Sequence, residues 1–252
     1  MLKPGTILKR LYDRLESNAK DQSIADLRLG LSYVGVRLHN GGTGIAALLP
    51  EKTPAGCTIL KEAGTYAGSG ASKILKYLVD GKSGLHLAMG FAAATAVIGP
   101  PESENEDREA TTTFNMQPGE KVAMVGLFSP LVDRIRATGA QLTIIEKNPE
   151  RLDLLPAEDR RRTLKECDVA IITATTLLNN TFEETMDALG SPRVAVLMGP
   201  STPLAAEIFR GTPLTQLGGA VVTDCARVLQ IISEGGGTPA LRPYLRFVNL
   251  MF

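Results

Sequence analysis

Polar side chains follow two apolar segments in the second half of the chain, and their types suit hydrogen bonding to a bound ligand. At the end of the segment DVAIITAT and just after it, the candidates are Thr173, Thr175, Asn179 and Thr181. At the end of the segment RVAVLMG and just after it, the candidates are Gly199, Pro200, Ser201 and Thr202, of which Ser201 and Thr202 carry hydroxyls. Capping the next helix needs only one or two such groups, so the surplus predicts a binding site, and two neighbouring polar loops could hold an oxyanion. Helix capping alone is the alternative interpretation.

Two further apolar segments end in residues that suggest nucleotide chemistry. Gly126 opens the loop GLFSP, where one glycine allows a tight turn, but the second glycine of a GxGxxG motif is absent. That absence weakens the prediction of ordinary dinucleotide binding. Glu146 follows 20 residues later, where the acid of a Rossmann fold meets the ribose of a nucleotide or S-adenosylmethionine. Phe128 would then lie against the base, whereas a solvated carboxylate is the alternative role for Glu146.

The supply of metal ligands restricts the metal chemistry open to the chain. Its only histidines are His39 and His86, and its three cysteines, Cys57, Cys167 and Cys225, form no close pair. A histidine-rich metal cage is therefore excluded, and the cysteine spacing argues against a CxxC metal site and against a disulfide framework. A bound metal would need oxygen ligands or would arrive already chelated. Asp224, the last residue of the segment GAVVTD, could ligate a metal, accept a proton or cap a helix, and capping is the simplest role.

The order of the segments predicts an α/β fold for the second half. From Gly119 onward, near-continuous apolar strands alternate with amphipathic helices over 129–138, 157–166, 180–189, 203–210 and 224–234. This alternation is typical of a Rossmann-like, mostly parallel sheet covered on both faces. Ligands of such sheets bind beyond the carboxyl ends of the strands, which is where the candidate residues lie.

The first half predicts a smaller α+β unit. We expect an amphipathic helix over 3–18, strands over 27–38 and 43–49 joined by the turn Asn40-Gly41-Gly42, and helices over 72–79 and 84–98. Residues 99–118 open with Gly-Pro-Pro and are rich in acidic residues, which is typical of a linker. The predicted domains are therefore 1–98, an acidic linker over 99–118, and 119–252.

Charge and hydropathy exclude several classes of partner. Lys plus Arg and Asp plus Glu both total 27 in 252 residues, so no overall field attracts nucleic acid or an anionic membrane. The N-terminal segment mixes charged with apolar residues, unlike a signal peptide or an anchor. We therefore expect a cytoplasmic protein that binds a small molecule and not nucleic acid or membrane, and a homo-oligomer is compatible with this composition.

Several motifs together resemble a prokaryotic family of proposed heavy-metal chelatases, formerly a domain of unknown function. The matching stretches are YVGVRLHNGGTGIAALL, GFAAATAV, VGLFSPLVDRI, IIEKNP, ITATTLLNNTFEE, GPSTPL and GAVVTD. The resemblance implies a domain similar to the enolase N-terminal fold, then a Rossmann-like domain, with a site between them. The chain departs from the family at Ala174 and Asn180, where glycines are usual, and at Thr95, where asparagine is common.

Three hypotheses follow. The leading one is that the protein binds or processes a metal, or a small anionic metal chelate, in the cleft between the domains. The second is an enzyme that uses a nucleotide or S-adenosylmethionine, and the third is a non-catalytic interaction module. No nucleophile and base pair is evident in the sequence, so no reaction is assigned.

Overall fold

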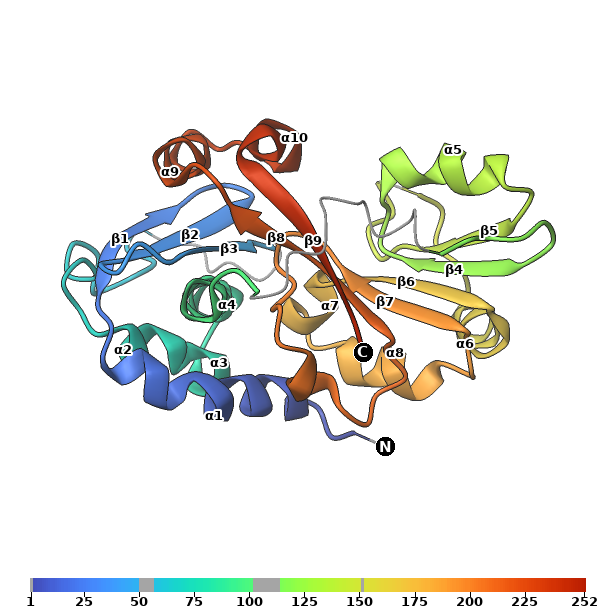
Figure 1. Ribbon diagram of the computed structural model, residues 1–252, viewed down its shortest axis with the longest axis horizontal. Coiled ribbons are helices and arrows are strands. Elements are labelled where there is room, and N and C mark those ends of the chain that lie inside the picture. The colour runs from blue at the N-terminus through green and yellow to red at the C-terminus, as the bar shows by residue number, and fades with distance from the viewer. Residues whose placement is uncertain (1, 50–56, 102–113, 151) are drawn as a thin grey trace.

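The computed structural model describes residues 2–49, 57–101, 114–150 and 152–252. Within these ranges every helix is too short or too polar to cross a lipid bilayer. The chain forms two sheets, one of three strands and one of six. Figure 1 shows the smaller sheet and its helices on one side of the molecule and most of the larger sheet on the other.

The first half begins with helix α1 (Thr6–Lys20), followed by the antiparallel strands β1 (Ile24–Leu29), β2 (Tyr33–Leu38) and β3 (Thr43–Ala47). The predicted hairpin turn is confirmed: Gly41 has a φ of 92°, and the Asn40 side chain accepts the N–H of Gly42 at 2.9 Å. The prediction of one strand over 27–38 is wrong. The N–H of Gly30 bonds to the carbonyl of Tyr33, and this tight turn separates β1 from β2.

Helices α2 (Ala71–Leu75), α3 (Tyr77–Asp80) and α4 (Gly84–Ile98) complete this half. Helix α4 has the predicted bounds, because Ser83 caps its start by accepting the N–H of His86 and Gly99 follows its last residue. The predicted helix over 72–79 is two short helices that meet at Lys76. Helix α4 packs on one face of the small sheet against β2 and β3, where Gly44 leaves room for the backbone of Ala92.

The second half holds the six-stranded sheet, in the order β5-β4-β6-β7-β8-β9. Its strands are β4 (Lys121–Val125), β5 (Gln141–Ile145), β6 (Val169–Thr173), β7 (Val194–Met198), β8 (Gln216–Val222) and β9 (Leu245–Met251). The strands from β5 to β8 pair in parallel, whereas β9 is antiparallel to β8. The predicted α/β fold with a mostly parallel sheet is therefore confirmed, and β9 was not predicted.

The helices of this half are α5 (Ser129–Ala137), α6 (Ala157–Glu166), α7 (Thr175–Leu178), α8 (Phe182–Ala188), α9 (Cys225–Ser233) and α10 (Thr238–Leu241). Helix α5 packs with Val122 and Met124 on one face of the sheet. Leu177 of α7 and Phe182 of α8 belong to the core on the other face. The helix predicted over 203–210 is only a 3-10 turn, η3 (Ala206–Phe209), and a second such turn, η4 (Arg242–Tyr244), leads into β9.

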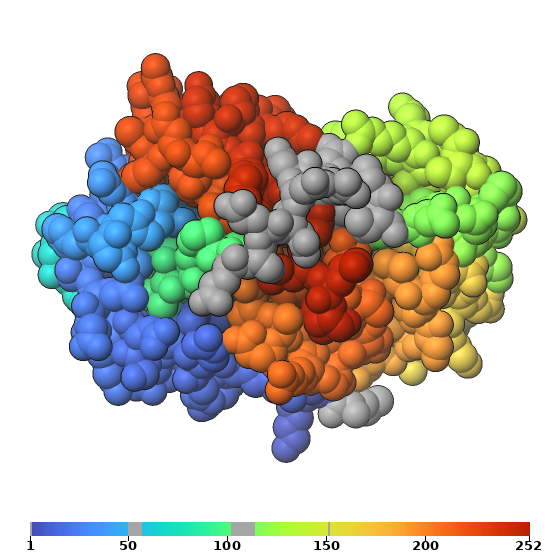
Figure 2. Space-filling model, in the orientation of Figure 1, coloured from blue at the N-terminus to red at the C-terminus, as the bar shows by residue number. Residues whose placement is uncertain are grey.

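The two halves share their hydrophobic core. Val228 and Ile232 of α9 pack with Tyr33 and Ile45 on the face of the small sheet that α4 leaves open. A Cβ atom on Gly35 would lie 2.6 Å from Leu229 Cδ2, so this glycine lets α9 approach. Figure 2 shows the orange atoms of the region that holds α9 lying directly against the blue atoms of the first half. The predicted domain boundaries stay a prediction, and most of the predicted linker (102–113) lies outside the described residues.

Candidate functional site

The candidate site is the edge of the large sheet where β4, β5, β6 and β7 end. The chain leaves β4 through α5 to β5 on one side, while β6 on the other side leads to β7. The carboxyl ends of the neighbouring strands β4 and β6 therefore flank the topological switch point, the usual ligand position in open α/β sheets. Gly126 directly follows β4 and Thr173 ends β6, and a Cβ atom on Gly126 would lie 2.7 Å from Thr173 Cγ2.

Gly126 is suited to this position by its backbone as well as by its size. Its φ of 84° lies in the left-handed region, which residues with side chains rarely adopt. Its N–H bonds to the carbonyl of Ile145 at 2.9 Å, which ties the β4 loop to the end of β5. The predicted tight turn is therefore present at the switch point.

Two threonine hydroxyls meet beside this glycine. Thr173 Oγ1 and Thr175 Oγ1 are 3.0 Å apart, and the N–H of Thr175 bonds to Thr173 Oγ1 at 3.3 Å. Both side chains are half-buried. A hydroxyl has one proton and two lone pairs, so this pair retains capacity to bond to a ligand.

The carboxylate of Glu146 connects the neighbouring loops through hydrogen bonds. Its Oε1 accepts the N–H groups of Lys147 at 2.7 Å and Asn148 at 3.2 Å, and its Oε2 accepts the N–H of Leu127 at 3.3 Å. The side chain is only 7% exposed. The carboxylate therefore joins the end of β5 to the loop after β4, and Phe128 in that loop is half-buried against the α5 face of the core.

The remaining candidates of the β6 loop bond to one another. Thr181 Oγ1 donates to Asn179 Oδ1 at 2.6 Å, and the Thr181 carbonyl accepts the hydroxyl of Thr185 at 2.7 Å. Asn180 between them has a φ of 60°. A left-handed residue explains why glycine suits this position, and asparagine tolerates it better than most residues.

The β7 loop joins the two halves of the protein. Gly199, with a φ of 128°, and Pro200 lead to Ser201, whose Oγ accepts the N–H of Ala47 at the end of β3, at 2.7 Å. Thr202 is 2% exposed, and within the described residues its hydroxyl has no hydrogen-bond partner. The loop is thus anchored to the small sheet and holds one buried polar group without a partner.

Asp224 lies away from this edge. Strand β8 continues to Val222 although its last partner on β7 is Gly218 opposite Met198, so Asp224 follows several residues beyond the other strand ends. Its carboxylate accepts the N–H of Arg227 at 3.0 Å and caps α9. Of the three predicted roles of Asp224, the structure shows helix capping, the simplest one.

Metal-ligating side chains do not gather anywhere in the described part of the chain: no group of three or more His, Cys, Asp or Glu residues could hold an ion there. His86 bonds through Nδ1 to Ser83 Oγ at 2.7 Å, and Cys167 is buried, where desolvation raises the pKa of its thiol to about 11.

Two polar residues of interest were not predicted from the sequence, the buried Glu183 and the exposed Lys82. The only sequence signal near Lys82 was the helix-capping pattern of the adjoining Ser83.

The fold and this edge define a two-sheet α/β protein with its candidate ligand site at the switch point of a Rossmann-like sheet. Residues 109–251 match the model of the family DUF364, described as "Putative heavy-metal chelation", and residues 12–98 match DUF4213, which has the same description. The chain belongs to the DUF364 family. The resemblance inferred from the sequence motifs is confirmed.

Relatives of this chain match it over most of its length. An uncharacterised protein of Methanocaldococcus jannaschii is 23% identical over 238 residues, which cover 88% of each chain. A protein of unknown function from Pyrococcus horikoshii, 20% identical, superposes with a TM-score of 0.84 over 98% of this chain and 100% of the other. One from Desulfitobacterium hafniense, 23% identical, gives a TM-score of 0.79 over 97% and 98%.

Proposed function

We propose that this protein binds a small, oxygen-rich metal chelate at the switch point between β4 and β6. The observation that carries the proposal is the contact between Gly126 and Thr173 at this point, beside the hydroxyl pair of Thr173 and Thr175. Because Gly126 has no side chain, the Thr173 side chain packs directly against it and is held at the switch point. The family description, heavy-metal chelation, supplies the chemical class.

The side chains at the edge favour a chelate over a bare ion. They are mainly hydroxyls and amides, and the carboxylate of Glu146 already accepts three backbone N–H groups through its two oxygens. Soft heavy metals prefer thiolate and imidazole ligands. A preformed chelate presents oxygen atoms to the protein, and hydroxyl and N–H groups can donate hydrogen bonds to them.

The same contacts give Glu146 a positioning role. A ribose-binding acid needs a free oxygen for the sugar hydroxyls, whereas this carboxylate holds the loops on either side of Gly126. We therefore place Thr173 and Thr175 against the ligand and Glu146 behind them. Gly199, Pro200 and the buried hydroxyl of Thr202 form the neighbouring loop, which Ser201 fastens to the first half.

Isothermal titration tests the proposal with ferric citrate, nickel citrate and a ferric catecholate as chelates, and with Ni²⁺ and Zn²⁺ as bare ions. The variant Thr173→Val/Thr175→Val keeps the side-chain shape and removes both hydroxyls. Two lost hydrogen bonds at about 1 kcal/mol each predict a roughly thirtyfold weaker chelate affinity. Thr65→Val is the matched control, because Thr65 is exposed and bonds only to its own turn.

Three results would contradict the proposal. Absence of binding for every chelate is the first, and equal chelate affinity in the double variant and the control is the second. The third is binding of adenosine nucleotides or S-adenosylmethionine in the same assay with loss in the double variant, which would assign the site to the nucleotide chemistry considered from the sequence.

A further inference from the structure

A second candidate site lies where the two halves meet on the side of α1 and α3. A cavity of about 500 Å³ opens there, within the range of volumes that small-molecule sites occupy. Its walls come from the start of α1, the connection between α3 and α4, and the end of α7, where Leu178 and Asn180 contribute. None of the residues assigned to the chelate site lines it.

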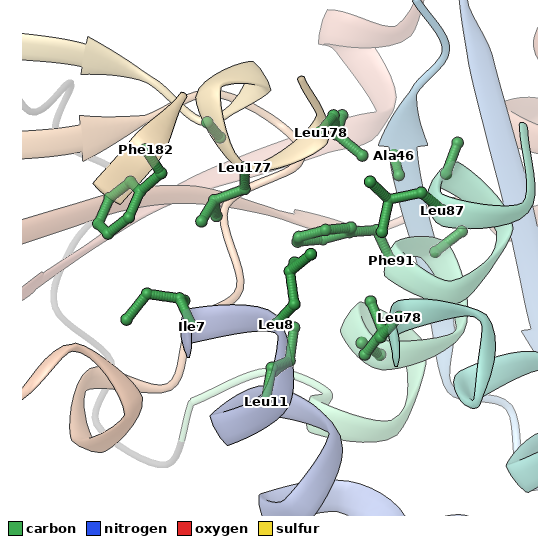
Figure 3. Packing of buried hydrophobic residues seen from close by; sticks show 14 of the residues in the cluster. Ile7, Leu8, Leu11, Ala46, Leu78, Leu87, Phe91, Leu177, Leu178 and Phe182 are labelled. Carbon is green, nitrogen blue, oxygen red and sulfur yellow. The ribbon is translucent and has the colours of Figure 1, made fainter. Parts of the chain in front are cut away.

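The floor of this cavity is apolar. Four buried leucines line it: Leu8 of α1, Leu78 of α3, Leu87 of α4 and Leu178 of α7. Figure 3 shows these side chains gathered around Phe91, each from a different helix. The half-buried ring of Tyr77 and the exposed side chain of Val79 extend the apolar wall toward solvent. A ligand with an apolar body would therefore be sheltered from water here.

The rim of the cavity carries positive charge. Lys9 and Lys82 line it, and its lining holds no acidic residue. Lys9 pairs with Asp13 one helical turn further on. Lys82 is exposed and, within the described residues, makes no hydrogen bond or ion pair, so its ammonium group is available to an anion.

Polar groups in the cavity wall strengthen the preference for an anion. Ser83 and Gly84 line the cavity at the start of α4, a 15-residue helix without an acidic residue in its first turn. The positive end of its dipole therefore borders the cavity and favours an anion there. Two carboxylates on adjoining helices are engaged: Asp80 at the end of α3 pairs with Lys76 at 3.4 Å, and Glu183 of α8 accepts the N–H of Ile7 at 3.1 Å.

We propose that this junction cavity binds a small organic anion with an apolar body, such as an aryl or alkyl carboxylate. The carboxylate lies at the rim between Lys82 and the start of α4, and the apolar body lies on the four leucines. This site is separate from the chelate site at the switch point, and its ligand needs no metal.

Titration of the full chain followed by amide NMR tests this inference with four metal-free probes. Benzoate and octanoate carry both required features, acetate lacks the apolar body, and benzamide lacks the charge. We expect benzoate and octanoate to shift the amide signals of Gly5, Gly84 and Asn180, and acetate and benzamide to need at least tenfold higher concentrations. Lys82→Gln should weaken benzoate about fivefold, the upper end of the contribution of an exposed charge pair.

Lys61→Gln provides the matched control, because Lys61 is an exposed lysine outside the cavity and its loss should leave the affinity unchanged. The inference is overturned if no probe shifts these amides at about 10 mM, if benzamide binds as well as benzoate, or if Lys82→Gln binds like the control variant. Shifts confined to Gly126 and Thr173 would also overturn it, because they would place the anion at the other site.

Discussion

The buried carboxylate of Glu183 on α8 accepts the backbone N–H of Ile7 in the first turn of α1, at 3.1 Å. Helix α1 has no acidic residue in its own first turn and no side-chain cap. Its N-terminal N–H groups need partners, and one of those partners comes from the other half of the chain. The two halves are therefore joined by helix capping as well as by their shared apolar core.

Glu183→Ala should lower the free energy of unfolding by about 1 to 2 kcal/mol, because the N–H of Ile7 is left buried without a partner. Urea denaturation followed by circular dichroism measures this difference. Glu184→Ala is the control, since Glu184 is exposed and its loss should change stability by less than about 0.5 kcal/mol. Equal losses in the two variants would mean that the bond to Ile7 contributes nothing.

Gly44→Ala should destabilise the protein by about 1 to 3 kcal/mol, the usual cost of overpacking a core. An added Cβ would overlap backbone atoms of Ala92 and Ala96 on α4. Gly70→Ala is the control, because its new Cβ would lie 3.6 Å from its nearest neighbour, Ser72 Oγ, and its φ of −63° suits alanine. Thermal unfolding of both variants checks this, and a Gly44→Ala protein as stable as Gly70→Ala would show that α4 can move away from β3.

The ion pair of Glu120 and Arg193 should make stability depend on acid pH. Hydrogen bonds from Arg193, at 2.6 and 2.8 Å, and from the N–H of Gln117 lower the pKa of Glu120 to about 2 from 4.5. Because the folded pKa is the lower one, the stabilisation is fully present above about pH 4.5 and is lost as the pH falls toward 2.

Glu120→Gln tests this dependence through urea denaturation at pH 7, 5, 3 and 2. The Arg193 side chain is 41% exposed, so solvent screening limits the expected loss at pH 7 to about 1 kcal/mol. The difference between variant and wild type should shrink as the pH falls below 4.5. A difference that stays constant down to pH 2 would rule out ionisation of Glu120 as its source.

Ser201 and Thr202 should respond in opposite ways to removal of their hydroxyls. Ser201→Ala leaves the N–H of Ala47 without its partner and should cost about 1 to 2 kcal/mol. Thr202→Val removes a buried hydroxyl that has no partner within the described residues, so it should be neutral or stabilising. Urea denaturation of the ligand-free protein compares them, and a loss of more than about 1 kcal/mol in Thr202→Val would show that this hydroxyl is bonded.

Local patterns predicted most elements of the fold but not the partners of those elements. Helix α4 has its predicted bounds because Ser83 and Gly99 act within the helix itself. The apolar face of α9 was equally visible, yet a periodic pattern does not show which surface it covers, and α9 covers the small sheet. Strand β9 was missed because its position depends on pairing with the distant β8.

The candidate site, like the fold, was predictable from the sequence only in part. The parallel topology explains why Gly126, Glu146 and Thr173 meet, since the ends of parallel strands lie at one edge. Asp224 does not join them, because the extra length of β8 depends on its antiparallel partner β9. Lys82 and Asn180 could not be paired from sequence, because they come from loops of different halves that only the packing of α1, α4 and α7 brings to one cavity.

The contact between α9 and the small sheet can form only late in synthesis on the ribosome. Strands β1 to β3 are synthesised first, but the residues that cover their second face, Val228 and Ile232, are among the last to emerge. Until then Tyr33 and Ile45 face water. Completion of the small sheet therefore waits for nearly the whole chain, and a nascent chain halted before residue 224 should expose an apolar surface open to chaperones.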